Sequence, residues 1–130
     1  MTATGRPEAE FDCDAAMRSN LLRVFSERDA ARRRAAIAEL YAPDAVLYEP
    51  EAVVAGQAAI SEAVDKLLST LPPDFTFTPI GSAVGHHGLA RLAWRGGPPE
   101  GPALVTGMDV ARFERGRIQT LHVLIDPVAR

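Results

Sequence analysis

One stretch of this chain predicts its fold, and it reads Leu40-Tyr41-Ala42-Pro43-Asp44-Ala45-Val46-Leu47-Tyr48-Glu49-Pro50. Its first residues continue the apolar face of a helix that also carries Ala36 and Ile37. Pro43 is expected to end that helix, because proline disfavours helical geometry in the residue before it. The alternation that follows predicts a short strand, which Pro50 interrupts.

Helices are expected before and after this transition, and strands dominate the second half of the chain. Helical spacing of apolar residues, an N-cap at Asp29 and the closing pair Pro72-Pro73 predict helices at 17–25, 29–41 and 60–71. Residues with a period of two, separated by Gly/Pro turns, predict strands at 45–49, 53–54, 75–79, 89–95, 103–113 and 117–126. Helices followed by antiparallel strands indicate an α+β sandwich.

Length and composition limit the classes of protein to consider. The chain has 130 residues, nearly half of them apolar, and a formal net charge of -3. We expect a flexible tail at 1–13 and one domain at 14–130. The small negative charge argues against nucleic acid as the main partner, because a basic face is expected there. The lone Cys13, the absence of an apolar leader and the shortness of the apolar runs predict a cytoplasmic protein with no membrane contact.

Asp109 is the candidate functional residue that strand alternation singles out. On its strand the side chains that share a face are Val105, Gly107, Asp109, Ala111 and Phe113. A carboxylate on such an apolar face costs several kcal/mol to bury unless it is paired or protonated. We therefore expect a raised pKa and an acid that donates a hydrogen bond. The alternative is a structural role, in which Asp109 caps backbone groups or pairs with an arginine.

Glu49 is the second candidate, at the end of the strand expected at 45–49. In an apolar environment its carboxylate suits a general base near neutral pH. Two carboxyls in one pocket would also push their titrations apart. The alternative is a solvated strand end, because Glu is rarely buried.

Several motifs, taken in order, resemble those of SnoaL-like and ketosteroid-isomerase-like proteins of the nuclear transport factor 2-like superfamily. They are the stretch 40–50 already quoted, Gly56–Ile60, Gly107–Phe113, Gly116–Ile118 and Leu121–Asp126. The resemblance covers about residues 14 to 127. It implies a cone, in which a strongly curved antiparallel sheet of about six strands wraps around three helices and leaves a pocket open at one end. It also implies a homodimer through the outer face of the sheet.

The same resemblance implies roles for the two acids. Glu49 stands where the steroid isomerases carry their catalytic aspartate, and Asp109 stands where they carry the neutral aspartic acid of the oxyanion hole. Two tyrosines of that pattern are missing, since Leu21-Leu22 and Val64 occupy their places, which argues against steroid isomerisation itself. The cone implies a pocket wall of Leu21, Leu47, Val64, Phe75, Phe77, Leu92, Trp94, Val123 and Ile125.

Histidines and clustered arginines have simpler interpretations. His86 and His87 are expected at a solvated hairpin tip, and Arg32-Arg33-Arg34 on the wet side of a helix. His122 should point away from the face that carries Leu121, Val123 and Ile125, towards a subunit interface.

Two functions remain open at this point. The first is an isomerase or cyclase that transfers a proton next to a carbonyl of a small hydrophobic substrate, with no cofactor and no metal. The second is a non-catalytic ligand-binding or dimerisation domain with the same fold, because fold alone does not decide function.

Overall fold

The computed structural model describes residues 11–127. The tail predicted at 1–13 therefore lies almost wholly outside the described residues. The elements follow in the order α1 (Cys13–Ser19), the π-helix η2 (Asn20–Phe25), α2 (Ala30–Leu40), β1 (Tyr41–Glu49), β2 (Ala52–Ala55), α3 (Gln57–Ser69), β3 (Thr76–His86), β4 (Leu89–Gly97), β5 (Val105–Glu114) and β6 (Arg117–Ile125).

The six strands form one curved, unclosed sheet in the order β2-β1-β6-β5-β4-β3. The predicted α+β cone is confirmed, with one difference in detail. The pair β1–β6 is parallel, whereas the other four pairs are antiparallel. A parallel pair needs a long connection between its strands, and here that connection is the whole segment from β2 to β5.

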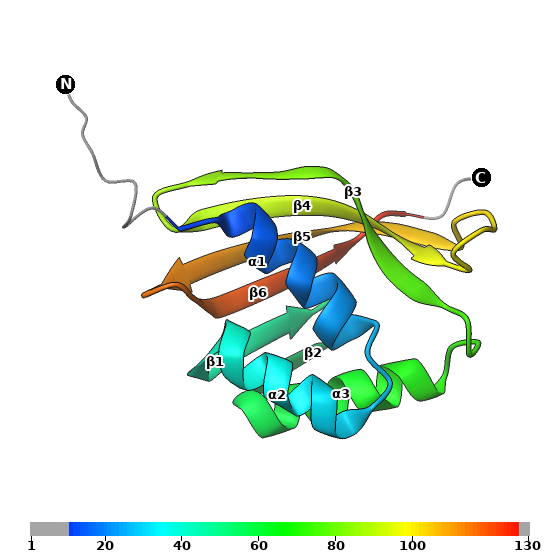
Figure 1. Cartoon of the computed structure of the whole chain (residues 1–130), viewed down its shortest axis with the longest axis horizontal. Coiled ribbons are helices and arrows are strands. Elements are labelled where there is room, and N and C mark those ends of the chain that lie inside the picture. The colour runs from blue at the N-terminus through cyan, green and yellow to red at the C-terminus, as the bar shows by residue number, and fades with distance from the viewer. Residues whose placement is uncertain (1–10, 128–130) are drawn as a thin grey trace.

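The helices lie together against one face of the sheet (Figure 1). Apolar side chains from the helices and from the inner face of the sheet, among them Met17, Ile37, Ile60, Leu92 and Leu121, pack into one core. At the start of the chain α1 also holds β3, since the Asp14 carboxylate accepts from the Ala83 N–H at 2.7 Å and Arg18 donates to the carbonyl of Gly81. Gly81 lies in the irregular segment of β3, with φ of 73°.

The helix-to-strand transition falls earlier than predicted, by one residue at the end of the helix and by four at the start of the strand. Helix α2 ends at Leu40, so Tyr41 is the first residue of β1 rather than the last of a helix. Pro43 lies inside β1, in the segment where the pairing with β6 shifts between Tyr41 and Val46. Proline has no N–H for a sheet ladder, and a break in the pairing removes the need for one. The shift matters because Tyr41 is fully buried at the centre of the fold.

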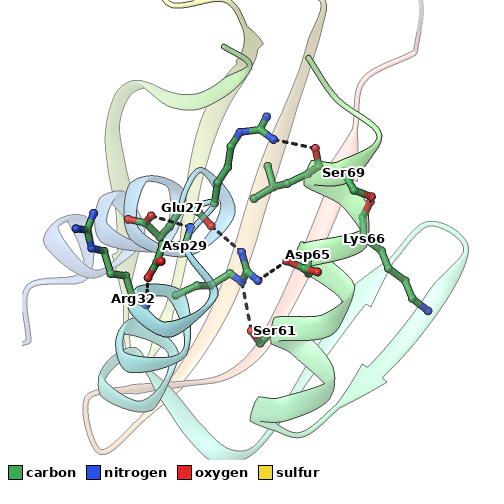
Figure 2. Close-up of polar contacts among 10 residues, drawn as sticks. Glu27, Asp29, Arg32, Ser61, Asp65, Lys66 and Ser69 are labelled. Atoms are coloured by element: carbon green, nitrogen blue, oxygen red, sulfur yellow. Dashed lines mark hydrogen bonds and ion pairs between the residues drawn. The ribbon is translucent and has the colours of Figure 1, made fainter. Parts of the chain in front are cut away.

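One of the three clustered arginines is buried, which corrects the prediction of a wet helix face. Arg32 and Arg34 are exposed, but Arg33 is only 1% exposed. Successive helical residues point about 100° apart, so three adjacent charges cannot all face water. The Arg33 guanidinium donates to Ser61 Oγ at 3.2 Å, to Asp65 Oδ1 at 2.8 Å and to the Glu27 carbonyl at 2.7 Å. In Figure 2, Ser61 and Asp65 lie on the side of α3 that faces α2 and the loop before α2, which carries Glu27.

No helix among residues 11–127 is long and apolar enough to cross a membrane.

Candidate functional site

Strand β5 directs Asp109 into the cone. Burial alternates along this strand, with Gly107, Asp109 and Ala111 buried and Met108 and Val110 half-buried. Asp109 is 3% exposed. This agrees with the face expected from strand alternation and makes Asp109 a carboxyl set among apolar neighbours.

Trp94 gives Asp109 its direct hydrogen bond. The indole Nε1 donates to Asp109 Oδ1 at 2.9 Å. Trp94 lies opposite Gly107 on the adjacent strand, and a Cβ at Gly107 would overlap the indole ring. Within residues 11–127 no arginine or backbone N–H bonds this carboxyl, so the two structural alternatives expected for Asp109 do not describe its contacts.

Burial dominates the acidity of Asp109. Loss of hydration raises the pKa of its carboxyl to about 7, and the nearby donors Trp94 and Asn20 partly oppose that rise. A desolvated carboxyl holds its proton because the charged form is the one that burial penalises. Asp109 can therefore remain a protonated carboxylic acid at a pH where an ordinary aspartate is fully ionised.

Asn20 and Tyr41 are buried neighbours of this acid, and neither was expected as a site residue from sequence. The Tyr41 hydroxyl donates to Asn20 Oδ1 at 2.5 Å, and both side chains are buried. Asn20 Nδ2 lies near enough to Asp109 to affect its pKa, yet it forms no complete hydrogen bond among the described residues. Asn20 falls on the same helical stripe as Met17 and Val24, and a polar residue on an apolar stripe is the signal that identifies it.

Glu49 is the last residue of β1 and lies on its inward face. It follows Ala45 and Leu47, which are fully buried, and its own side chain is half-buried. Burial raises the pKa of the Glu49 carboxyl above its ordinary value. The exposure of Glu49 is thus intermediate between the two predictions, which were a base in an apolar environment and a solvated strand end.

Glu49 and Asp109 line the same cavity, which has a volume of about 200 Å³. Among its described lining residues these two carboxyls are the ionisable groups, and the rest of the wall is apolar or aromatic. The other lining residues are Leu21, Phe25, Pro50, Leu67, Leu71, Phe75, Phe77, Trp94, Val105, Val123 and Ile125.

Three residues of the expected wall lie elsewhere. Leu47, Val64 and Leu92 are fully buried core residues that do not line the cavity. Alternation along a strand and helical spacing identify the inward face, but they do not say how deep along the cone a side chain lies. The wall also contains residues that were not expected from sequence: Phe25, Pro50, Leu67, Leu71 and Val105.

The three histidines lie outside the cavity. His86 and His87 are exposed at the β3–β4 turn, as expected. His122 is exposed on the outer face of the sheet and stacks on Tyr48, with ring centroids 4.5 Å apart and an interplanar angle of 11°. Over the described part of the chain, no group of three or more His, Cys, Asp or Glu side chains is arranged to hold a metal ion.

Solved structures with the same cone support the fold. A protein provisionally named as an isomerase of the SnoaL-like family, from Agrobacterium tumefaciens, is 24% identical, with a TM-score of 0.80 over 87% of this chain and 96% of that chain. A provisionally named ketosteroid isomerase from Kribbella flavida is 13% identical, with a TM-score of 0.67 over 90% and 79%. A provisionally named polyketide cyclase from Sinorhizobium meliloti is 20% identical, with a TM-score of 0.63 over 92% and 99%.

Sequence comparison identifies the family. No significant match was found among curated proteins. The sequence model of the SnoaL-like domain, however, matches residues 20–121, which span most of the chain and include Asn20, Glu49, Trp94 and Asp109. This chain therefore belongs to the SnoaL-like domain family.

Proposed function

We propose that this protein is an isomerase or cyclase that transfers a proton next to a carbonyl group of a small hydrophobic substrate. The observation that carries the proposal is that Glu49 and Asp109 line one apolar cavity and that burial raises the pKa of both. Acids with perturbed pKa values cluster at functional sites, and an apolar pocket with a few convergent polar groups is the default candidate for such a site.

The two acids have complementary tasks. Glu49, as carboxylate, takes a proton from the carbon beside the carbonyl. Asp109, as carboxylic acid, donates a hydrogen bond to the oxygen on which enolate charge develops. Glu49 then returns the proton to another carbon, so the chemistry requires no cofactor. The apolar wall keeps water away from Asp109, which strengthens its hydrogen bond to the developing enolate.

This division of roles sets the pH dependence. The active state needs Glu49 ionised and Asp109 protonated. Glu49 ionises above its raised pKa, and Asp109 loses its proton around pH 7. We expect a bell-shaped rate profile whose alkaline limb falls through about pH 7, with apparent values that belong to the pair.

Proton exchange tests the proposal directly. Small cyclic ketones incubated in D₂O with the protein should exchange their α-protons, as followed by NMR. Glu49→Gln should lower the exchange rate by about 10²- to 10⁴-fold, and Asp109→Asn by about 10²- to 10³-fold. Glu51→Gln is the matched control, because Glu51 is an exposed carboxyl two residues from Glu49 and outside the cavity wall.

Ligand binding separates catalysis from the alternative function. A phenol that mimics the enolate should bind with an affinity that both Glu49→Gln and Asp109→Asn change. Unchanged affinity in both variants would sink the site assignment. Binding of the phenol without any exchange of ketone protons would instead support the non-catalytic ligand-binding domain.

We also propose a homodimer through the outer face of the sheet, in a cytoplasmic protein with a reduced Cys13. Support comes from the exposed apolar side chains Ile80, Val84, Leu89 and Leu124, each about half exposed on that face. Exposed apolar side chains gathered on one face of a sheet can mark a contact surface. Sedimentation velocity should give a dimer for the parent chain and a monomer for Leu124→Glu. Leu22→Glu, at an exposed position of η2 among the helices, should leave the dimer intact.

A further inference from the structure

A buried amide lies behind the acid of the candidate site without a complete set of partners. Asn20 is 1% exposed, and among the described residues its Nδ2 forms no hydrogen bond. A buried donor without an acceptor is destabilising, and native proteins seldom retain one without a reason. An acceptor for the Asn20 Nδ2–H group is therefore expected close by.

Tyr41 fixes the direction of the amide. Its hydroxyl donates to Asn20 Oδ1 at 2.5 Å, so the carbonyl end of the amide faces Tyr41 and the NH₂ end faces away from it. Burial raises the pKa of Tyr41 well above its ordinary value of 10.0, so this hydroxyl keeps its proton at physiological pH and remains the donor. Asn20 is also the first residue of the π-helix η2, an irregularity that is frequent at functional sites.

The carboxyl of Asp109 is the acceptor that fits, because Leu21, the residue after Asn20, lines the same cavity as Asp109, and both Asn20 and Asp109 are buried. Asn20 lowers the pKa of Asp109, which means that its NH₂ group interacts with the ionised carboxylate more favourably than with the protonated acid. The interaction therefore gains strength as Asp109 becomes negative. This is the behaviour required of a group that supports an acid while that acid shares its proton with a ligand oxyanion.

We propose that Asn20, oriented by Tyr41, is a positioning residue for Asp109: its Nδ2–H group completes a hydrogen bond to the Asp109 carboxyl as negative charge develops there. The second donor to the acid is then an asparagine from the helix side, in addition to Trp94 from the sheet side. This inference deepens the proposed function and depends on it for its catalytic meaning.

Trp94 reports the state of Asp109 without any ligand. It is the single tryptophan of the chain, and its indole N–H bonds the Asp109 carboxyl. Its fluorescence should therefore change across pH as Asp109 ionises, and Asp109→Asn should abolish that change. The other titratable groups near the acid are Tyr41, which stays neutral over this range, and Glu49, which shares the cavity. A Glu49→Gln background removes the second contribution.

The experiment compares the fluorescence midpoint of the parent chain, Asn20→Leu and Tyr41→Phe. Asn20→Leu removes the donor and should raise the midpoint by about one pH unit. Tyr41→Phe leaves the donor but frees the amide, so it should raise the midpoint by less. An unchanged midpoint in Asn20→Leu overturns the proposal, even if urea denaturation shows a lower stability, because a merely structural residue would lower stability without altering the acid. If Asn20→Leu does not fold, an unchanged midpoint in Tyr41→Phe overturns it.

Binding of the phenolic enolate mimic provides the second measurement. Asn20→Leu should weaken binding several-fold in the parent background and have no further effect in the Asp109→Asn background. Equal effects in both backgrounds contradict an action through Asp109. A shifted fluorescence midpoint in a protein that binds no phenol would retain the positioning role and refute the proposed function, so the two failures are distinguishable.

Discussion

A single glycine makes room for the indole ring that donates a hydrogen bond to Asp109. Gly107 lies opposite Trp94, and the indole ring packs in the space that a side chain at Gly107 would fill. The carbonyl of Leu124 lies just as close to that space, so the neighbours cannot both withdraw. The hydrogen bond from Trp94 to Asp109 thus requires a glycine at position 107 of β5.

Gly107→Ala should therefore damage the site through overpacking. We expect a loss of about 1–3 kcal/mol in the free energy of unfolding, together with a change in Trp94 fluorescence as the indole moves away from Asp109. Urea denaturation followed by fluorescence measures both. Gly101→Ala is the control, because a side chain there would approach only Pro98. Normal stability and an unaltered emission spectrum in Gly107→Ala would contradict this account of the packing.

At the scale of elements, one arginine joins α2 to α3 and so supports the wall of the cavity. Arg33 reaches from α2 to Ser61 and Asp65 of α3 and to the Glu27 carbonyl (Figure 2). Helix α3 and the turn after it in turn supply Leu67 and Leu71 to the cavity wall. Because Asp65 is 65% exposed, water screens the ion pair, and the hydrogen bonds and the buried stem of Arg33 contribute most of its effect.

Arg33→Ala should cost about 3 kcal/mol in the free energy of unfolding, from three lost hydrogen bonds and lost packing. Arg34→Ala, one residue along the same helix at an exposed position, should change it by less than about 0.5 kcal/mol. Thermal and urea denaturation of the two variants make the comparison. Equally small losses in both variants would contradict a stabilising role for the Arg33 contacts.

At the scale of the whole molecule, Asp109 makes global stability depend on pH. Its pKa is about 7 in the folded protein against an ordinary value of 3.8, so the folded state holds the proton more tightly than the unfolded state. A group of this kind contributes stability that is fully present below pH 3.8 and is lost as pH rises through 7. The direction is opposite to that of an acid in a salt bridge.

Asp109→Asn should remove this dependence. Between pH 5 and pH 7 the free energy of unfolding of the variant should rise relative to the parent chain by about 3 kcal/mol, at about 1.36 kcal/mol per pH unit, and the difference should level off by pH 8. Urea denaturation at intervals across this range measures the difference. Asp74→Asn, at an exposed loop position, should show no such trend. A pH-independent difference between Asp109→Asn and the parent would mean that Asp109 is ionised throughout.

Local patterns were sufficient for the α+β class, the inward face of β5 and the choice of Asp109, because alternation and helical spacing are properties of neighbouring residues. Glu49 was chosen mainly by resemblance. The pairing of β1 with β6, the burial of Arg33, the cavity shared by Glu49 and Asp109, and the contacts of Asn20, Tyr41 and Trp94 were decided only by the tertiary structure. Each of these joins segments far apart in the chain, and the depth of a side chain in the cone depends on how those segments pack, which no local pattern encodes.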